Sequence, residues 1–145
     1  MNTNRPIAAT FSLNDYNFKN AILNFDIPKS KLELDLSFMP TAFFSSDKRA
    51  CFVDLQFIAS LGEKEHSDPE VVAQTIMSAN FVFDRELTSK EDVPSYFYSN
   101  ALAIMFPYVR AFISTLTLQA NVKPLIIPTM NLAVLKEKLE QNTEF

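Results

Sequence analysis

The spacing of apolar residues changes from a period of two to a helical period near residue 95. Before this point, apolar and polar residues alternate within several segments, which is typical of half-buried β-strands. After it, apolar residues recur at the spacing of a helix. The pattern predicts strands followed by helices in a single domain, residues 1–145, with 1–10 and 142–145 expected to be flexible.

Four strands are predicted before this change. The first, from about 11 to 27, must contain a bulge or bend near 19 to 21, because its apolar residues switch parity there. The residues expected to point inward from the fourth strand, 71 to 87, are Ile76, Phe81 and Phe83.

The second and third strands are predicted to form a hairpin. Four apolar residues share one face of the second strand, 31 to 38: Leu32, Leu34, Leu36 and Phe38. Pro40 interrupts this strand, and an apolar continuation leads to a polar turn at 45 to 48. The third strand, 49 to 60, is apolar on parts of both faces.

The predicted long helix, which ends near residue 119, is apolar nearly all round. One side carries Leu102, Met105, Phe106, Val109, Phe112, Ile113 and Leu116. The other side carries Ile104, Tyr108, Ala111, Thr115 and Leu118. Because one layer of strands covers one side only, the second side predicts contact with another copy of the chain.

Two residues depart from this apolar helical pattern. Pro107 is best tolerated as the first residue of a helix, so the main helix is expected to begin there after a shorter helical segment or a kink. Arg110 is expected to form a structural ion pair, because its guanidinium lies among apolar side chains.

The chain after the long helix contains two capping signals. Asn121 tolerates a positive φ and is expected to end the helix. An apolar connector bounded by prolines follows, and Asn131 is expected to cap a last helix that runs to about Gln141. One side of that helix carries Leu132, Leu135 and Leu139.

Composition excludes several functional classes. A single glycine rules out a glycine-rich phosphate cradle, and a net charge of −4 with scattered basic residues argues against nucleic acid as a partner. The one cysteine, Cys51, excludes an internal disulfide and fits the cytoplasm. No segment reaches the roughly 18 uncharged apolar residues of a membrane helix, so no membrane insertion is expected.

The sequence does not contain a recognisable group of catalytic or metal-binding side chains. The one histidine, His66, lies in a charged segment without a defined ligand scaffold. Cys51 is expected to be a small buried side chain. Glu33 and Asp35 are expected to lie on the solvent-exposed face of a strand. We expect no enzyme activity, no metal and no cofactor.

One feature of the sequence points to a binding function: apolar residues lie outside the predicted regular helices and strands. Phe43, Phe44 and the connector segment 124 to 128 are either core or an exposed binding groove. Both interpretations are open at this point.

Two segments in the C-terminal third resemble the SecB protein-export chaperone family. Phe106-Pro107-Tyr108-Val109-Arg110 is similar to the Phe-Pro-Tyr-Ala-Arg segment that opens the family's long helix. Residues 124 to 132 are similar to the family's Leu-rich stretch and its Pro-Pro-x-Asn-Phe signature, with Thr129 and Leu132 at two signature positions. The resemblance covers most of residues 11 to 140.

The resemblance implies a fold, a partner class and a set of binding residues. The fold would be α+β, a four-stranded antiparallel sheet packed on one long helix plus a shorter C-terminal helix, assembling as a dimer of dimers. The function would be that of an ATP-independent cytoplasmic chaperone that holds unfolded precursor proteins for export, with SecA as a further partner docking at Asp26. The groove and lid residues would be Leu32, Leu34, Leu36, Phe43, Phe44, Pro124, Leu125, Ile126, Ile127, Pro128, Leu132 and Leu135. The second side of the long helix, given above, would face sister subunits.

Other functions are compatible with the same residues. The chain could be a SecB-like chaperone dedicated to one partner, such as an antitoxin. A small acyl-binding or thioesterase-like protein would also place a helix on a sheet, with Asp54 and Asp84 as its candidate carboxylates. A structural subunit with a permanently occupied apolar surface is a third alternative.

Overall fold

A computed structural model of the chain describes residues 10–24, 34–61 and 70–145. Four long strands form most of one sheet: β1 (Phe11–Leu23), β2 (Leu34–Phe44), β3 (Ala50–Leu61) and β4 (Glu70–Phe83). A 3₁₀ turn, η1 (Lys90–Asp92), precedes the helices α1 (Phe97–Gln119) and α2 (Leu132–Gln141). The last element is the short strand β5 (Thr143–Glu144).

The sheet has five strands in the order β1-β4-β3-β2-β5. The four long strands pair antiparallel, whereas β5 pairs parallel with β2. The expected four-stranded antiparallel sheet is therefore corrected to a mixed sheet with five strands. The same strand corrects the expectation of a flexible segment at 142–145, because Thr143 is buried and paired.

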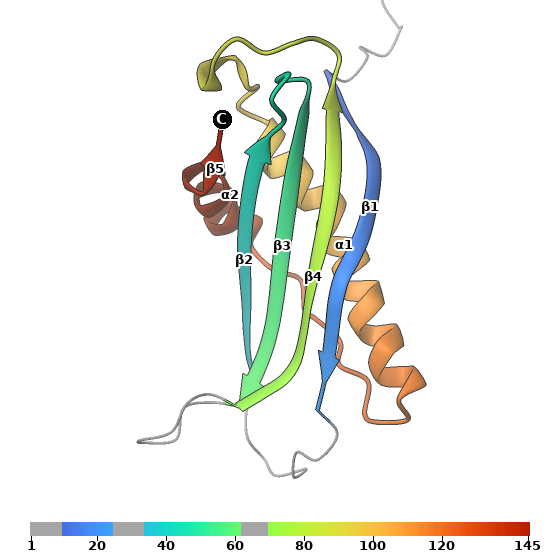
Figure 1. Cartoon of the computed structure of the whole chain (residues 1–145). Coiled ribbons are helices and arrows are strands. Elements are labelled where there is room, and N and C mark those ends of the chain that lie inside the picture. The colour runs from blue at the N-terminus through green and yellow to red at the C-terminus, as the bar shows by residue number, and fades with distance from the viewer. Residues whose placement is uncertain (1–9, 25–33, 62–69) are drawn as a thin grey trace, which may run out of the picture.

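The core lies between one face of the sheet and α1, which runs behind the strands in Figure 1. In β3, every second side chain from Cys51 to Leu61 is buried, which follows from the two-residue period of a strand. In α1, a stripe at every fourth residue is buried: Phe97, Ala101, Met105, Val109, Ile113 and Thr117. We call the face of the sheet that carries α1 the inner face and the opposite one the outer face.

The predicted bulge in β1 is confirmed. Phe18 pairs with Met77 and Asn20 with Ile76, so Lys19 is the extra residue. A second register shift lies between Leu13 and Asp15. Because each extra residue reverses the parity, Phe11, Leu13, Phe18 and Leu23 all lie on the inner face, on both sides of the bulges.

The expected interruption of β2 at Pro40 is wrong. Pro40 pairs with Leu55 in a strand that continues to Phe44. Its carbonyl oxygen accepts a hydrogen bond from Asn142 Nδ2, so its backbone faces the outer edge of β2. An edge position does not need the N–H that proline lacks, which explains why the strand tolerates it.

Two predictions for β4 and α1 are also corrected. In β4, Phe81 and Phe83 point inward as predicted, but Ile76 lies on the outer face, and Thr75 and Met77 are buried in its place. The helix α1 begins ten residues before Pro107 and continues through it. The buried stripe of α1 stabilises the helix on both sides of Pro107, which offsets the missing hydrogen bond.

Both predicted caps are confirmed. Asn121 has φ 57°, and the N–H groups of Asn121 and Val122 donate to the carbonyl oxygens of Leu118 and Thr117 at 3.1 and 3.3 Å, which is a Schellman motif. Asn131 Oδ1 accepts from the Ala133 N–H at 3.0 Å and starts α2.

By length and composition, α1 is also long and apolar enough to cross a membrane, with a mean hydropathy of 1.5 over its most apolar window. That window contains Arg110, so α1 has no uninterrupted run of 18 uncharged residues. Core helices of soluble proteins pass the same test, and the buried stripe of α1 packs against the sheet.

Candidate functional site

A groove opens between the outer side of α1 and the connector that follows it. Its volume is about 560 Å³, and we call it the helix groove. Nine residues line it: Phe106, Pro107, Arg110, Ala111, Ser114, Thr115, Leu118, Pro124 and Ile126. This lining is mostly apolar and contains a single charged side chain.

Hydrogen bonds to α1 fix the connector beside this groove. The Leu125 N–H donates to Thr117 Oγ1 at 2.9 Å, and Ser114 Oγ donates to the Leu125 carbonyl oxygen at 3.3 Å. Because the backbone is extended here, neighbouring side chains point in opposite directions. Ile127 is therefore fully buried, while Ile126 is 64% exposed.

Arg110 supplies the charge in the helix groove. Its side chain is exposed, so it does not need a buried partner. The ion pair found among the described residues joins Lys19 and Asp54 instead, at 2.7 Å on the outer face of the sheet. The structural ion pair predicted for Arg110 is absent from this part of the chain, and its guanidinium is open to a ligand or to solvent.

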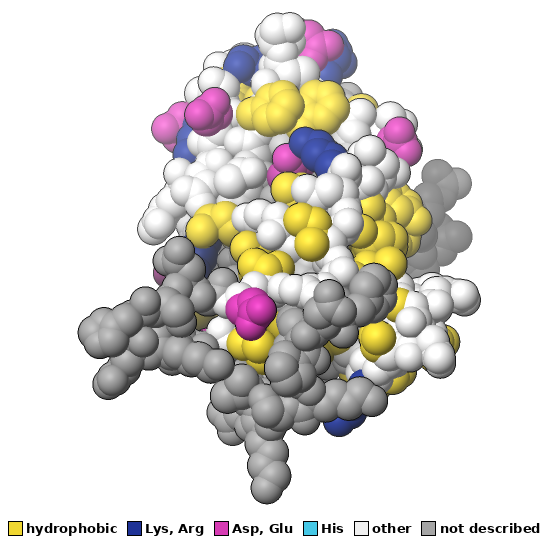
Figure 2. All heavy atoms as spheres, turned by 60° about the horizontal axis from the view of Figure 1, so that its bottom comes forward, with side chains coloured by type: hydrophobic (Ala, Val, Ile, Leu, Met, Phe, Trp, Pro, Cys, Tyr) yellow, Lys and Arg dark blue, Asp and Glu magenta, His cyan; other side chains and the backbone are white. Residues whose placement is uncertain are grey.

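A second groove, of about 590 Å³, lies where the outer face of the sheet meets the end of the chain. We call it the edge groove. Its lining is formed by Met39, Thr41, Ala42, Phe43, Phe52, Asp54, Gln141, Asn142, Thr143 and Glu144. The rings of Phe43 and Phe52 stack with centroids 5.1 Å apart. In Figure 2, hydrophobic side chains reach the surface between charged ones on the faces that this view shows.

The residues predicted to bind polypeptide fall into three groups. Exposed are Leu34, Phe43, Pro124, Ile126 and Pro128, and half-buried are Leu36, Leu125 and Leu132. Buried are Phe44, Ile127 and Leu135. Leu32 and the predicted SecA-docking residue Asp26 lie outside the described residues, as does His66.

Four of the residues predicted to face sister subunits lie on the side of α1 that the sheet leaves uncovered, and Tyr108 lies at its margin, where its ring contacts Tyr16 of β1. Tyr108 and Leu118 are 38% and 61% exposed. Ala111 and Thr115 are also exposed, and Ile104 is half-buried. Three of these residues line the helix groove together with Ile126, so the structure brings the two predicted surfaces together.

Sequence reasoning missed Phe52 and Met39 as surface residues. Phe52 pairs with Phe43 across the hairpin formed by β2 and β3. The position of the polar turn at 45 to 48 predicts that Phe43 and Phe52 lie opposite each other, because a turn fixes the register of the strands it joins. Met39 shares the outer face with Phe43 and is 48% exposed.

The candidate chemical groups lie apart from one another. Burial raises the pKa of Cys51 to about 12, so its thiol is protonated at neutral pH. Asp54 is ion-paired with Lys19, and Asp84 is exposed beyond the end of β4. Among residues 10–24, 34–61 and 70–145, no three His, Cys, Asp or Glu side chains cluster to hold a metal ion.

Comparisons with known proteins identify the fold. No family model matches the chain. The SecB-like chaperone of Mycobacterium tuberculosis, solved in complex with a peptide from the HigA1 antitoxin, superimposes with a TM-score of 0.63 at 17% identity, over 83% of this chain and 91% of that one. The fold is SecB-like.

A sequence relative adds a local match. Over 49 residues, the chain is 51% identical to an uncharacterised protein of Methanocaldococcus jannaschii. The match covers 31% of this chain and 32% of that protein, so the chain spans about a third of the length of this curated relative.

Proposed function

We propose that this chain is an ATP-independent SecB-like chaperone that binds apolar stretches of unfolded polypeptide. The observation that carries the proposal is the exposure of large apolar side chains along two open grooves. Ile126 and Leu118 are 64% and 61% exposed in or beside the helix groove, and Phe43 is 50% exposed in the edge groove. Exposed apolar surface of this kind is typical of binding sites.

The physical basis of this holding function is the hydrophobic effect acting at several weak sites. Covering apolar surface contributes about 25 cal/mol per Å², and an unfolded chain offers many apolar stretches. A chain that contacts both grooves at once gains avidity, because the second contact forms within the complex. Neither step needs nucleotide or a reactive group, so the proposed function is not enzymatic.

Two client classes are candidates. The first is the set of precursor proteins awaiting export, with SecA as a partner and Asp26 as a docking residue. The second is a single dedicated partner, such as an antitoxin. The antitoxin peptide bound to the M. tuberculosis protein supports the second class.

We also propose that the chain assembles as a dimer of dimers in the cytoplasm. The uncovered side of α1 supports an assembly, because Leu118 there is 61% exposed in a single copy. The helix groove would then lie at or beside the contact between subunits.

Suppression of aggregation tests the chaperone proposal. A denatured model protein is diluted into buffer with the wild-type chain or with the double variant Phe43→Ser and Ile126→Ser, and light scattering is followed. We expect the wild type to suppress aggregation and the variant to lose most of that protection. Both changed side chains are exposed, so the fold should be retained, and thermal melting by circular dichroism checks this.

A matched control separates the grooves from apolar surface in general. Ile22 and Val134 are 49% and 58% exposed and line neither groove. The variant Ile22→Ser and Val134→Ser should protect as well as the wild type. Equal protection by all three proteins, or by none, would show that the grooves do not bind unfolded chains.

A further inference from the structure

Residues 142–145, which we call the C-terminal segment, lie along the outer edge of β2. The Ala42 N–H donates to the Asn142 carbonyl oxygen at 3.2 Å, and Asn142 Nδ2 donates to the Pro40 carbonyl oxygen at 3.2 Å. Thr143 and Glu144 form β5 opposite Ala42 and Phe43. The C-terminal segment therefore holds the position that a strand added to this edge would take.

An aromatic side chain anchors the end of this segment. The rings of Phe145 and Phe44 lie with centroids 5.0 Å apart, and Lys48 Nζ lies 4.5 Å from the centre of the Phe145 ring. Phe44 in turn contacts Phe83 in the core, at 5.7 Å between centroids. The site thus combines main-chain hydrogen bonds along β2 with a receptor for one aromatic ring.

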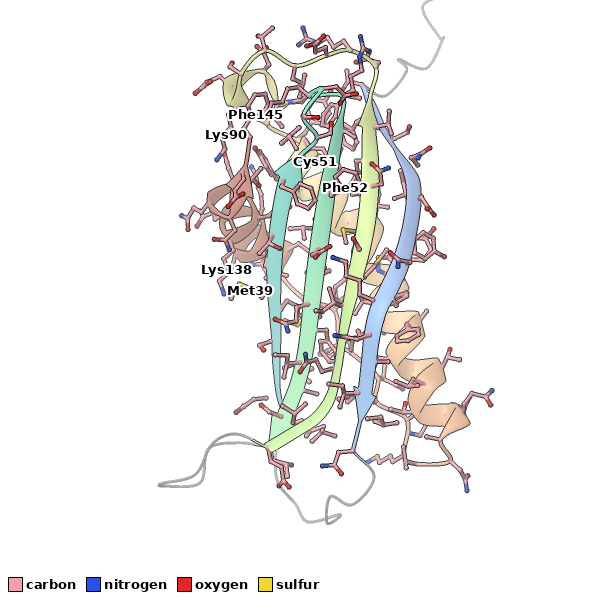
Figure 3. The ribbon with its side chains drawn as sticks, in the orientation of Figure 1. Met39, Cys51, Phe52, Lys90, Lys138 and Phe145 are labelled. Carbon is pink, nitrogen blue, oxygen red and sulfur yellow. The ribbon has the colours of Figure 1, made fainter. Side chains whose placement is uncertain are left out.

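Lys90 ties the same segment to the turn before α1. Its Nζ donates to the carbonyl oxygens of Glu140 and Thr143, both at 3.2 Å. Figure 3 shows Lys90 and Phe145 near the same end of the molecule, with Lys138 and Met39 farther along β2. The C-terminal segment and the end of α2 are therefore held by the same lysine.

The paired part of the C-terminal segment is short. It consists of two residues in parallel pairing, which is slightly less stable per residue than antiparallel pairing. A longer extended polypeptide would make more hydrogen bonds on the same edge, because the structure shows β5 paired only with Ala42 and Phe43 of β2. The C-terminal segment is thus a weak occupant that a longer strand can replace.

Two predicted binding residues are buried, one beside this segment and one in the helix that precedes it. Phe44 is 7% exposed beside Phe145, and Leu135 of α2 is 6% exposed. Both would become more accessible if the C-terminal segment left β2 and α2 moved with it.

We propose that the C-terminal segment is an internal substitute for bound polypeptide. The site it fills accepts an extended segment with an aromatic side chain, paired with β2 near Ala42, and such a segment binds by displacing residues 142–145. The proposal deepens the proposed chaperone function and rests on it for the identity of the incoming chain. It makes the edge of β2 a regulated binding site, whose apparent affinity depends on the fraction of molecules in which the C-terminal segment is displaced.

A peptide with the sequence of residues 139–145, amidated at its end and fluorescently labelled, is the probe. A variant lacking residues 142–145 should bind it saturably in an anisotropy titration. The full-length chain should bind it about tenfold more weakly, as expected if its site is filled for nine-tenths of the time. A peptide with alanine in place of the phenylalanine should lose most of its binding.

A second set of variants keeps the test valid if the shortened chain does not fold. Phe145→Ala weakens the attachment of the C-terminal segment in the full-length chain and leaves the site itself intact, so it should bind the probe more tightly than the wild type. Lys90→Met removes a donor that the probe would use as well, so it should bind the probe no more tightly than the wild type. Lys138→Met is the matched control, because this α2 lysine lies away from Phe145 in Figure 3, and it should bind like the wild type. Hydrogen exchange at the Ala42 amide checks whether the segment has loosened.

The results separate this proposal from the chaperone function. Failure of the folded shortened variant to bind the probe would overturn the proposal, as would equal affinity for the full-length chain and Phe145→Ala. In that case the C-terminal segment is structural only. Aggregation suppression by the wild-type chain is measured in parallel, and its presence or absence decides the chaperone function independently.

Discussion

Phe18 of β1 and Phe112 of α1 stack with ring centroids 4.1 Å apart and ring planes 12° apart. One turn earlier in the helix, Tyr108 lies 4.4 Å from Tyr16, measured between centroids. β1 is one of the two edge strands of the sheet, and among the strands that the structure describes it pairs with β4 alone. These two aromatic pairs therefore attach the edge strand to the helix that covers the core.

The first prediction concerns the Phe18 and Phe112 pair. Each single change to alanine should lower the free energy of unfolding by about 2 kcal/mol, below the roughly 3–5 kcal/mol of a fully buried Phe because both rings are half-buried. The double variant should lose less than the sum, by about 0.5–1.5 kcal/mol, because the stacking is lost only once. Urea unfolding of the four proteins measures this coupling, and strict additivity would contradict it.

The second prediction concerns Asn121, whose φ of 57° ends α1. Asn121→Ala should lower the free energy of unfolding by about 1 kcal/mol, because the left-handed conformation costs alanine more than asparagine. Asn121→Gly should be tolerated. Asn100 is exposed in the regular part of α1, so Asn100→Ala should have the opposite sign. Thermal melting of the three variants tests the assignment, and a similar loss for both alanine changes would be evidence against it.

The third prediction concerns Cys51, which is fully buried in β3. Burial raises the pKa of the thiol from 9.0 to about 12, so native protein at pH 8 should react with a thiol reagent only through unfolding. The rate should rise to that of a free thiol in denaturant. Rapid labelling of the native chain would contradict the buried position.

The same raised pKa gives a dependence of stability on pH. The unfolded thiol ionises above about pH 9, whereas the folded thiol stays protonated until about pH 12. The stabilisation is therefore complete below pH 9 and is lost as the pH rises from 9 to 12, at about 1.4 kcal/mol per pH unit. Cys51→Ala removes this contribution. The difference between the two proteins in unfolding free energy should narrow across this range.

The fourth prediction concerns the uncovered side of α1. Leu118→Arg should reduce the mass measured by light scattering, because a charge would replace an apolar side chain at the proposed subunit contact. Gln119→Arg adds the same charge at the neighbouring exposed position and should leave the mass unchanged. If Leu118→Arg has the mass of the wild type, this side of α1 is not the contact.

Local sequence predicted the features of this fold that depend on near neighbours. The strand alternation, the turn after Phe44, the bulge at Lys19, and the caps at Asn121 and Asn131 each involve a few adjacent residues. Their physical causes, which are side-chain parity and backbone conformational preference, act over the same short range. These predictions are confirmed.

Predictions that depend on distant neighbours were less complete. Pro40 looked like an interruption because its sequence does not show that its backbone faces the sheet edge. Pro107 looked like a helix start because the sequence does not show how strongly the core holds the helix on both sides of it. The strand β5 was missed, since two residues carry no periodicity and their partner lies a hundred positions away.

The sequence by itself determined which side chains are apolar, where the chain turns, and which residues share a face of a strand or a helix. Tertiary structure decided which apolar residues are core and which are surface. Phe43 and Phe44 are adjacent and identical, yet one is 50% exposed and the other 7%, because Phe44 packs against Phe83 and Phe145 while Phe43 faces the edge groove. Burial depends on what packs against a side chain, and only the folded chain brings those partners together.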